Sequence, residues 1–174
     1  MSIRKIIIEP DTILRKKSEP LHQVNNDTRK LLDDMLKTMY AAPGIGLAAV
    51  QIGILKRVIV IDISKKEEKK NPILLINPEI TFQSKETSIY EEGCLSLPGY
   101  FAEIERPAKC KVNYIDYHGK KTELEAQGLL STCVQHEIDH LNGILFIDYL
   151  SKLKKDMIIK KLKKQKKEQN QAIL

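Results

Sequence analysis

The sequence predicts an α+β fold: a single domain in which small mixed or antiparallel sheets surround one central helix, followed by a C-terminal helix. Strand signals, a helix, more strand signals and two helices succeed one another without the regular alternation of a doubly wound sheet. Residues 128–142 are largely apolar and carry an H-E-x-x-H pattern, so they are expected to form the central helix. A length of 174 residues favours one domain over residues 1–174.

The first strand is expected at residues 3–8, where an apolar run precedes an irregular segment bounded by Pro10 and Pro20. A segment that is small and flexible at both ends, residues 44–53, leads into a second strand at residues 57–62. This second strand is apolar throughout its centre, which is typical of a buried strand.

The first helix is expected to begin at Asp27, which can cap it, and to end at Pro43-Gly44. Apolar side chains recur along it at helical spacing and predict a face packed into the core. They are Leu31, Leu32, Met35, Leu36, Met39 and Tyr40.

Four further strands are expected after an exposed charged loop at residues 64–70. Their ranges are 73–76, 80–83, 109–115 and 122–126, with turns at Asn77-Pro78 and His118-Gly119. The central helix over about 128–142 is expected to stop at Asn142-Gly143. The short apolar segment 144–147 then leads to the last helix.

The last helix is expected over about residues 149–168. Four apolar side chains fall on one stripe and are predicted to pack its first turns against the body: Leu153, Met157, Ile158 and Leu162. Residues 152–168 hold nine lysines and two acidic residues, while the whole chain has a net charge of +6. The rest of the chain is therefore close to neutral, which gives no reason to expect a DNA-binding body.

Composition excludes several classes of protein. Hydrophobic residues make up 42% and charged residues 30%, as in a globular protein with a core. The sequence has no apolar run of the roughly 18–20 residues that span a bilayer, and its apolar start is too short for a signal peptide. Three cysteines argue against a disulfide framework. The protein is expected to be cytoplasmic.

The H-E-x-x-H pattern is Gln135-His136-Glu137-Ile138-Asp139-His140. On a helix, His136 and His140 lie one turn apart on the same face, so both imidazoles can reach one metal ion. Glu137 is then well placed beside a metal-bound water, as in metallohydrolases that use this glutamate as general base. The alternative is a chance pattern on a solvated helix. The apolar neighbours favour a core helix, where two histidines and a glutamate are costly unless they are paired.

A catalytic site of this kind needs a third protein ligand and an open position. No histidine follows His140, and the acidic residues after it have no persuasive setting. Upstream candidates are His22, His118, Cys94, Cys110 and Cys133. Cys133 would be cramped on the same helix, and Cys110 alternates with Val112 as a buried strand residue would. Cys94 lies in a turn marked by glycine and proline, where a thiolate can be aimed, and is the best candidate.

Three segments together resemble the signature motifs of the peptide deformylase family. They are residues 44–51 (GIGLAAVQ), 92–96 (EGCLS) and 135–140 (QHEIDH), in the family's order and at suitable separations. The similarity covers nearly the whole chain, and the last helix also resembles the bacterial form. The family fold is an α+β unit with the motif helix embedded among small sheets.

The resemblance implies hydrolytic removal of the N-formyl group from the initiator methionine of new proteins, with release of formate. By position it makes Cys94, His136 and His140 the metal ligands and Glu137 the acid/base. Gln51 and Leu95 become the donors to the developing oxyanion. One divalent ion per chain is implied, Fe²⁺ in the cell, while Zn²⁺, Ni²⁺ or Co²⁺ suit the same ligands. Such an ion lowers the pKa of a bound water from 15.7 to about 7.

The substrate is expected to lie against the glycine-rich segment. Gly44 and Gly46 allow close approach of an extended peptide, and Ile45, Leu129 and Cys133 can line an apolar slot for the methionine side chain. For Ile45 and Leu129, ordinary core packing is an equal alternative. Glu92 and Arg106 match a pair expected to brace the cysteine turn. Many bacterial relatives carry an arginine shortly after the cysteine motif to hold the substrate backbone, whereas this chain reads PGYFA at residues 98–102.

Two other functions compete with this interpretation. A metallopeptidase cutting internal peptide bonds would need a downstream third ligand and a long cleft, and the sequence predicts neither. A zinc-stabilised module that binds RNA or the ribosome would need a fourth protein ligand at its metal site. As partners we expect formyl-methionyl nascent chains and no membrane. Ribosome binding through the lysine-rich last helix is a hypothesis, and a plain solvated helix end is its alternative.

Overall fold

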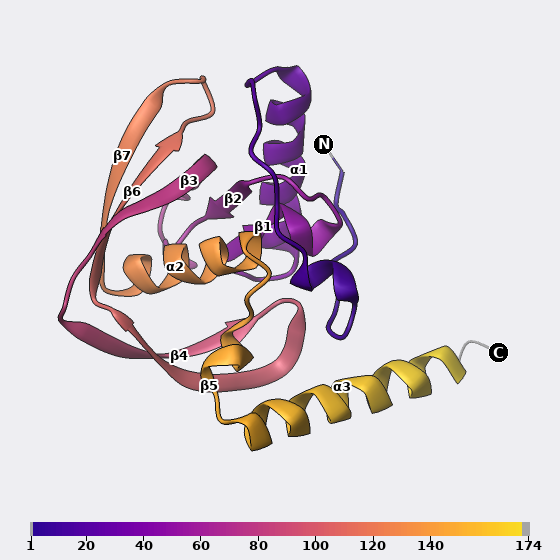
Figure 1. Ribbon diagram of the computed structural model, residues 1–174. Helices are drawn as coiled ribbons and strands as arrows, with labels where there is room; N and C mark the ends of the chain where they lie inside the picture. Colours follow the sequence, from indigo (N-terminus) through magenta and orange to yellow (C-terminus); the bar gives the residue numbers. More distant parts are fainter. Residues whose placement is uncertain (1, 172–174) are drawn as a thin grey trace.

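A computed structural model describes residues 2–171 of the protein (Figure 1). The helices are α1 (Asn26–Ala41), α2 (Leu129–Leu141) and α3 (Lys152–Gln171), with short 3-10 helices η1 (Thr12–Arg15), η2 (Ala49–Ile52) and η3 (Phe146–Tyr149). The strands are β1 (Gly46–Ala48), β2 (Val58–Ile61), β3 (Ile73–Gln83), β4 (Thr87–Cys94), β5 (Leu97–Pro107), β6 (Lys109–Ile115) and β7 (Lys121–Gln127). The predicted α+β fold class is confirmed.

The strands form two antiparallel units. One is a five-stranded sheet in the order β1-β2-β3-β6-β7, and the other is a ribbon in which β4 pairs with β5. Figure 1 shows α2 in the middle of the molecule, between the sheet and the ribbon, while α3 runs beside β5 toward the C-terminus. The central helix expected from the sequence is therefore α2.

Alternate side chains of β2 build two cores on the two faces of the sheet. Ile59 and Ile61 join a cluster with Val134, Ile138 and other residues of α2. On the opposite face the remaining β2 side chains, Val58 and Val60, pack with Leu32, Met35 and Met39 of α1. This period-two division explains why β2 reads as apolar throughout: both of its faces are covered.

Helix α2 is buried along most of its length, including the polar residues of its motif. Gly128 precedes it at φ +60° and Gly143 follows it at φ +75°, backbone conformations that suit glycine. The expected range and the expected stop at Asn142-Gly143 are confirmed.

Two expectations for the first part of the chain were wrong. Residues 3–8 form no strand; the hydrogen bonds of the segment include Ile7 N–H to the Gln51 carbonyl, a contact with η2 rather than with a sheet edge. Helix α1 is capped by Asn25 rather than Asp27, because the Asn25 side chain accepts from the Thr28 amide in a capping box. Its end before Pro43-Gly44 is confirmed.

The strands of the middle region also differ from the prediction. The expected strands 73–76 and 80–83 are one strand, β3, with a register shift between Ile76 and Glu79 instead of a turn. Asn77 takes φ +50° there, and its side chain bonds the backbone of Leu21 at both N–H and C=O. Strands β4 and β5 were missed because their buried face carries the charged residues Glu92 and Arg106, while Ile89 and Phe101 are exposed, so the apolar alternation is lost.

The last helix begins at Lys152 rather than near residue 149, because residues up to Tyr149 form η3. Its apolar stripe is only partly used. Ile158 and Leu162 pack against the cluster that contains Leu97 and Phe146, but Leu153 and Met157 are 72% and 50% exposed. Packing by these last two residues was predicted wrongly. Within residues 2–171, none of the helices has the length and apolar character needed to cross a bilayer.

Candidate active site

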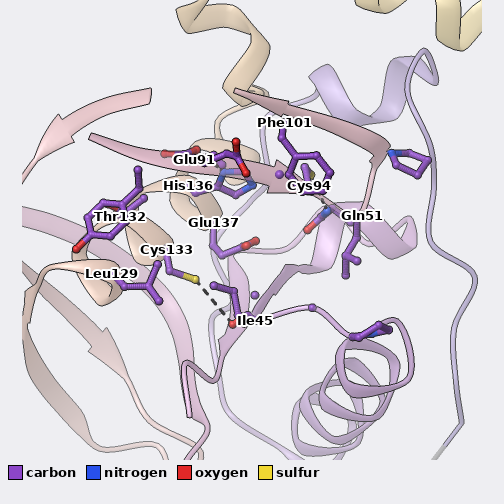
Figure 2. Close-up of a pocket in the computed structure, with 18 of the residues that line it drawn as sticks. Ile45, Gln51, Glu91, Cys94, Phe101, Leu129, Thr132, Cys133, His136 and Glu137 are labelled. Atoms are coloured by element: carbon purple, nitrogen blue, oxygen red, sulfur yellow. Dashed lines mark hydrogen bonds and ion pairs between the residues drawn. The ribbon is translucent and has the colours of Figure 1, made fainter. Parts of the chain in front are cut away.

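A cavity of about 390 Å³ opens where β1, the β4–β5 ribbon and α2 meet. Figure 2 shows its labelled side chains: Gln51 and Cys94 lie on one side, Leu129 and Thr132 on the other, and Glu137 between them. The three sequence motifs, far apart in the chain, therefore meet around one cavity. Of the labelled residues, Cys94 and Gln51 lie toward one end of the cavity, and Leu129 and Cys133 toward the other.

Three potential metal-ligand atoms converge beside this cavity. One atom each from Cys94, His136 and His140 lie within 4.8 Å of one another. Cys94 Sγ is 3.3 Å from His140 Nε2, and the two imidazole rings have centroids 5.0 Å apart. One sulfur and two imidazole nitrogens form a donor set that suits a catalytic divalent ion with an open position. The residues fit the ion that the sequence predicts.

The orientation of His136 is fixed by a buried carboxylate. His136 Nδ1 lies 2.8 Å from Glu92 Oε2. Since a carboxylate only accepts, Nδ1 carries the proton and the lone pair of Nε2 is left for a metal. Arg106 donates to Glu92 at 2.5 and 3.0 Å. Burial alone would raise the pKa of Glu92, but the hydrogen bonds from His136 and Arg106 outweigh it and hold that pKa low.

Glu137 lines the cavity and is 4% exposed. Its Oε2 is buried and has no hydrogen-bond partner among residues 2–171, so no described residue occupies its lone pairs. Burial raises the pKa of this carboxyl to about 7. Gly46 is what admits it: a side chain at residue 46 would collide with the Glu137 carboxylate. The absence of a side chain at Gly46, in the first motif, therefore leaves room for Glu137, in the third motif.

Gln51 and Leu95 lie beside the sulfur of Cys94. The Gln51 side chain is held by the Ala48 amide, which donates to Oε1 at 2.8 Å, so its NH₂ group faces Ser96 Oγ at 3.1 Å and Cys94 Sγ at 3.5 Å. Leu95 occupies the turn between β4 and β5, and its side chain covers Gly44, where an added Cβ would lie 2.7 Å from Leu95 Cδ1. Both residues line the cavity.

The substrate residues expected from the sequence are all at the cavity. Gly44, Ile45, Gly46, Leu129 and Cys133 line it. Ile45 and Leu129 remain 45% and 40% exposed, which agrees better with a pocket wall than with core packing. Cys133 is buried, and its thiol faces the Ile45 carbonyl at 3.8 Å (Figure 2).

Sequence reasoning missed several residues of the cavity. Thr132, buried on α2, and Tyr90 on β4 line it, as does Phe101 on β5. Phe101 is 64% exposed and lies in residues 98–102, where the resemblance to the family leads to the expectation of an arginine. Its ring covers Gly93, its cross-strand partner. Only the departure from the family pattern could have drawn attention to it, because an isolated exposed aromatic has no local signature.

The other candidate ligands lie outside the group formed by Cys94, His136 and His140. Cys110 is buried in β6, with the Ser131 hydroxyl 3.5 Å from its sulfur. Burial raises the pKa values of Cys110 and Cys133, so both keep their protons and are poor metal ligands.

Comparison with known proteins agrees with this geometry. The family model of polypeptide deformylase matches residues 3–156. A peptide deformylase of Pelagibacter ubique is 62% identical over 164 residues, which cover 94% of this chain and 95% of that protein. One of Bartonella henselae is 57% identical over 98% of this chain and 97% of its own length.

Solved structures of the family are similar to this chain as well. The crystal structure of peptide deformylase from Ehrlichia chaffeensis in complex with actinonin superposes with a TM-score of 0.91. It is 47% identical, and the match covers 95% of this chain and 98% of that one. The chain therefore belongs to the peptide deformylase family, metal-dependent hydrolases that remove the N-formyl group from nascent peptides.

Proposed function

We propose that Cys94, His136 and His140 hold one divalent ion per chain, and that this ion is Fe²⁺ in the cell. The observation that carries the proposal is the convergence of their three ligand atoms within 4.8 Å, at one end of a cavity that also contains Glu137. When bound, such an ion activates water and polarises a carbonyl. The choice of Fe²⁺ rests on the family resemblance, since the same donors also accept Zn²⁺, Ni²⁺ and Co²⁺.

In this proposal, Glu137 is the general acid/base. It takes a proton from the attacking water and returns one to the leaving amine of methionine. Two groups donate to the oxyanion that develops on the formyl oxygen: the side-chain amide of Gln51 and the backbone N–H of Leu95. The support for Gln51 is its fixed rotamer, which turns its NH₂ group toward Cys94.

The apolar end of the cavity takes the methionine side chain in this proposal. Ile45, Leu129 and Cys133 form its walls, and Gly44 and Gly46 let the extended substrate backbone approach. We further propose that residues 1–174 form one deformylase domain that acts in the cytoplasm on chains leaving the ribosome. The family match supports this extent over residues 3–156, which leaves out most of α3.

Formate release distinguishes this function from cleavage of internal bonds. The metal-loaded protein is incubated with a formyl-Met-Ala-Ser peptide and, separately, with an internally quenched peptide that lacks a formyl group. We expect formate from the first and no cleavage of the second. Cleavage of the quenched peptide at a comparable rate would contradict the assignment and favour a metallopeptidase.

The nature of the ion can be tested by exposure to air. An Fe²⁺ form prepared without oxygen is expected to lose activity at least several-fold faster in air than a Ni²⁺ form, because iron cycles its oxidation state beside an oxidisable thiolate, Cys94. The measurement is the half-life of formate release in both forms under identical oxygen pressure. Equal half-lives would remove the argument for oxygen-sensitive iron.

We also propose that α3 attracts ribosomal RNA. Ile158 and Leu162 anchor the helix, while the lysines beyond Met157 are exposed to solvent. They are Lys160, Lys161, Lys163, Lys164, Lys166 and Lys167. Binding through them should weaken with salt by roughly 0.7–0.9 logarithmic units per phosphate contact for each tenfold rise in salt.

Truncation after Leu162 is expected to reduce co-sedimentation with ribosomes at low salt. Turnover of a small formyl-Met peptide should stay near that of the full chain, because Leu162, the buried anchor of α3, is retained. A full-length chain in which Lys163, Lys164, Lys166 and Lys167 are replaced by Gln separates charge from helix length. Unchanged co-sedimentation of both variants would refute this role of α3 without affecting the enzymatic assignment.

A further inference from the structure

Tyr149 ends a chain of hydrogen bonds that begins at His136. It is the last residue of η3 and is 50% exposed. Its hydroxyl oxygen lies 2.7 Å from Asp139 Oδ2 and 3.4 Å from Arg106 Nη1. A carboxylate only accepts and a guanidinium only donates, so the hydroxyl donates to Asp139 and accepts from Arg106.

Arg106 connects this end of the chain to the metal-ligand histidine. It donates to Asp139 through Nη1 at 2.8 Å and to Glu92 through Nε and Nη2 at 2.5 and 3.0 Å. Glu92 in turn holds Nδ1 of His136 at 2.8 Å. The side chains of Arg106 and Glu92 are each 4% exposed, so water cannot readily replace a contact that is lost.

The single positive charge of Arg106 is shared between two carboxylates. A stronger contact of the guanidinium with Asp139 therefore weakens the contact of the guanidinium with Glu92. The hydroxyl of Tyr149 gives Asp139 a second donor, and the Tyr149 ring covers the guanidinium with its centroid 4.7 Å from Cζ. Both contacts favour the arrangement in which Arg106 keeps two of its N–H groups on Glu92.

The same short helix also touches His136 directly. The ring of Phe146, the first residue of η3, stacks on the imidazole of His136 with centroids 6.2 Å apart and 24° between the ring planes. Helix η3 therefore contacts this histidine directly through Phe146. It is also linked to the histidine indirectly, from Tyr149 through Arg106 and Glu92. Packing accounts for Phe146, which is buried, but not for the contacts of the hydroxyl of Tyr149, a half-exposed residue.

We propose that Tyr149 is a positioning residue for the metal centre: it holds Asp139 and Arg106 so that Glu92 keeps His136 directed at the ion. The inference rests on the proposed role of His136 as a ligand. Tyr149 lies outside the three sequence motifs, in the segment that joins α2 to α3.

The test uses the full chain loaded with Co²⁺, whose visible spectrum reports on its ligands. In Tyr149→Phe we expect Co²⁺ affinity, measured by competition with a chelator, to fall about 3–10-fold. This is less than the roughly 10–100-fold typical when a direct outer-shell partner is lost. The spectrum should shift, and kcat for a formyl-Met peptide should fall while KM stays unchanged.

Tyr117→Phe is the matched control. Tyr117 has a similar environment away from the site: its ring lies 5.9 Å from Cζ of Arg29, and its hydroxyl is 3.5 Å from Asp33. It should keep the parent affinity and spectrum. In an Asp139→Asn background, Tyr149→Phe should add little, because the hydroxyl acts through Asp139.

Parent-like Co²⁺ affinity and spectrum in Tyr149→Phe would overturn the proposal, as would an undiminished effect in the Asp139→Asn background. If Tyr149→Phe fails to fold, Tyr149→Leu, which removes both the hydroxyl and the ring over Arg106, provides the test, with a fall in Co²⁺ affinity of at least the same size expected. His136→Ala separates this outcome from failure of the ligand assignment. If His136→Ala retains Co²⁺, the role of His136 as a ligand is refuted. If His136→Ala loses Co²⁺ but Tyr149→Phe is unaffected, only the role of Tyr149 is refuted.

Discussion

Replacing Glu137 by Gln is expected to lower kcat by roughly 10²–10⁴-fold, the usual contribution of a general acid–base. The amide has almost the same shape as the carboxyl, but it cannot take a proton from water or return one to the leaving amine. Glu137 is 4% exposed and Oε2 has no hydrogen-bond partner in the described chain, so the substitution removes no internal contact of that oxygen. Metal content and melting temperature should stay near the parent values.

Glu103→Gln controls for the loss of one negative charge. Glu103 is exposed on β5, directly across the ribbon from Glu91, and it does not line the cavity. Its variant should match the parent chain in turnover and metal content. If Glu137→Gln kept more than a tenth of the parent turnover, Glu137 would not be the acid/base.

Gly46→Ala tests the position of the same carboxylate without changing its chemistry. The added methyl group would occupy the space of the Glu137 carboxylate, which must then move or the strand β1 must shift. We expect turnover to fall while the bound metal is retained, because the three atoms nearest to the added Cβ all belong to Glu137 and none to Cys94, His136 or His140. Retained turnover would mean that Glu137 can act from a displaced position.

The parts of the site that could be predicted from the sequence are those with a local periodicity. His136 and His140 are four residues apart, and a buried helix of ordinary geometry must bring them to one face. The helix itself follows from its apolar neighbours. Cys94 could be singled out because a turn marked by glycine and proline frees a side chain from the sheet, and the family motif supplied Gln51 and Leu95.

The β4–β5 ribbon could not be predicted because its buried face carries charge. Glu91, Glu103 and Glu105 point to solvent, while Glu92 and Arg106, on the buried face, pair with each other. A buried ion pair therefore replaces the apolar residues that a strand pattern requires. The arginine was recognised through the family, and its bond to Glu92 is what allows both charges to be buried.

Tertiary contacts also decide which apolar residues of α3 are used. Leu153 and Leu162 are equally apolar, but only Leu162 meets the cluster around Phe146, whereas Leu153 is 72% exposed. At about 100° per residue, side chains nine residues apart lie on opposite faces of a helix, so α3 cannot turn both toward the body. The contacts of Tyr149 with Asp139 and Arg106 are tertiary as well, because they join residues from three separate elements.

Cys94→Ser is expected to cost more metal affinity than the roughly 10–100-fold lost with an outer-shell partner, because a hydroxyl is a poor substitute for a thiolate ligand. The sulfur of Cys94 lies 3.3 Å from Nε2 of His140, and Gln51 Nε2 and the Ser96 amide approach it at 3.5 and 3.4 Å. The serine oxygen keeps these neighbours but does not supply the anionic sulfur. Metal content after dialysis against a weak chelator measures the effect.

The other two cysteines provide matched controls for this substitution. Cys110 and Cys133 are more buried than Cys94, and burial keeps both as neutral thiols by raising the pKa of each. Cys110→Ser and Cys133→Ser should therefore retain metal, although Cys133→Ser changes the wall of the cavity. Loss of metal from Cys110→Ser together with its retention by Cys94→Ser would overturn the ligand set, and with it the proposed place of Glu137 beside the ion.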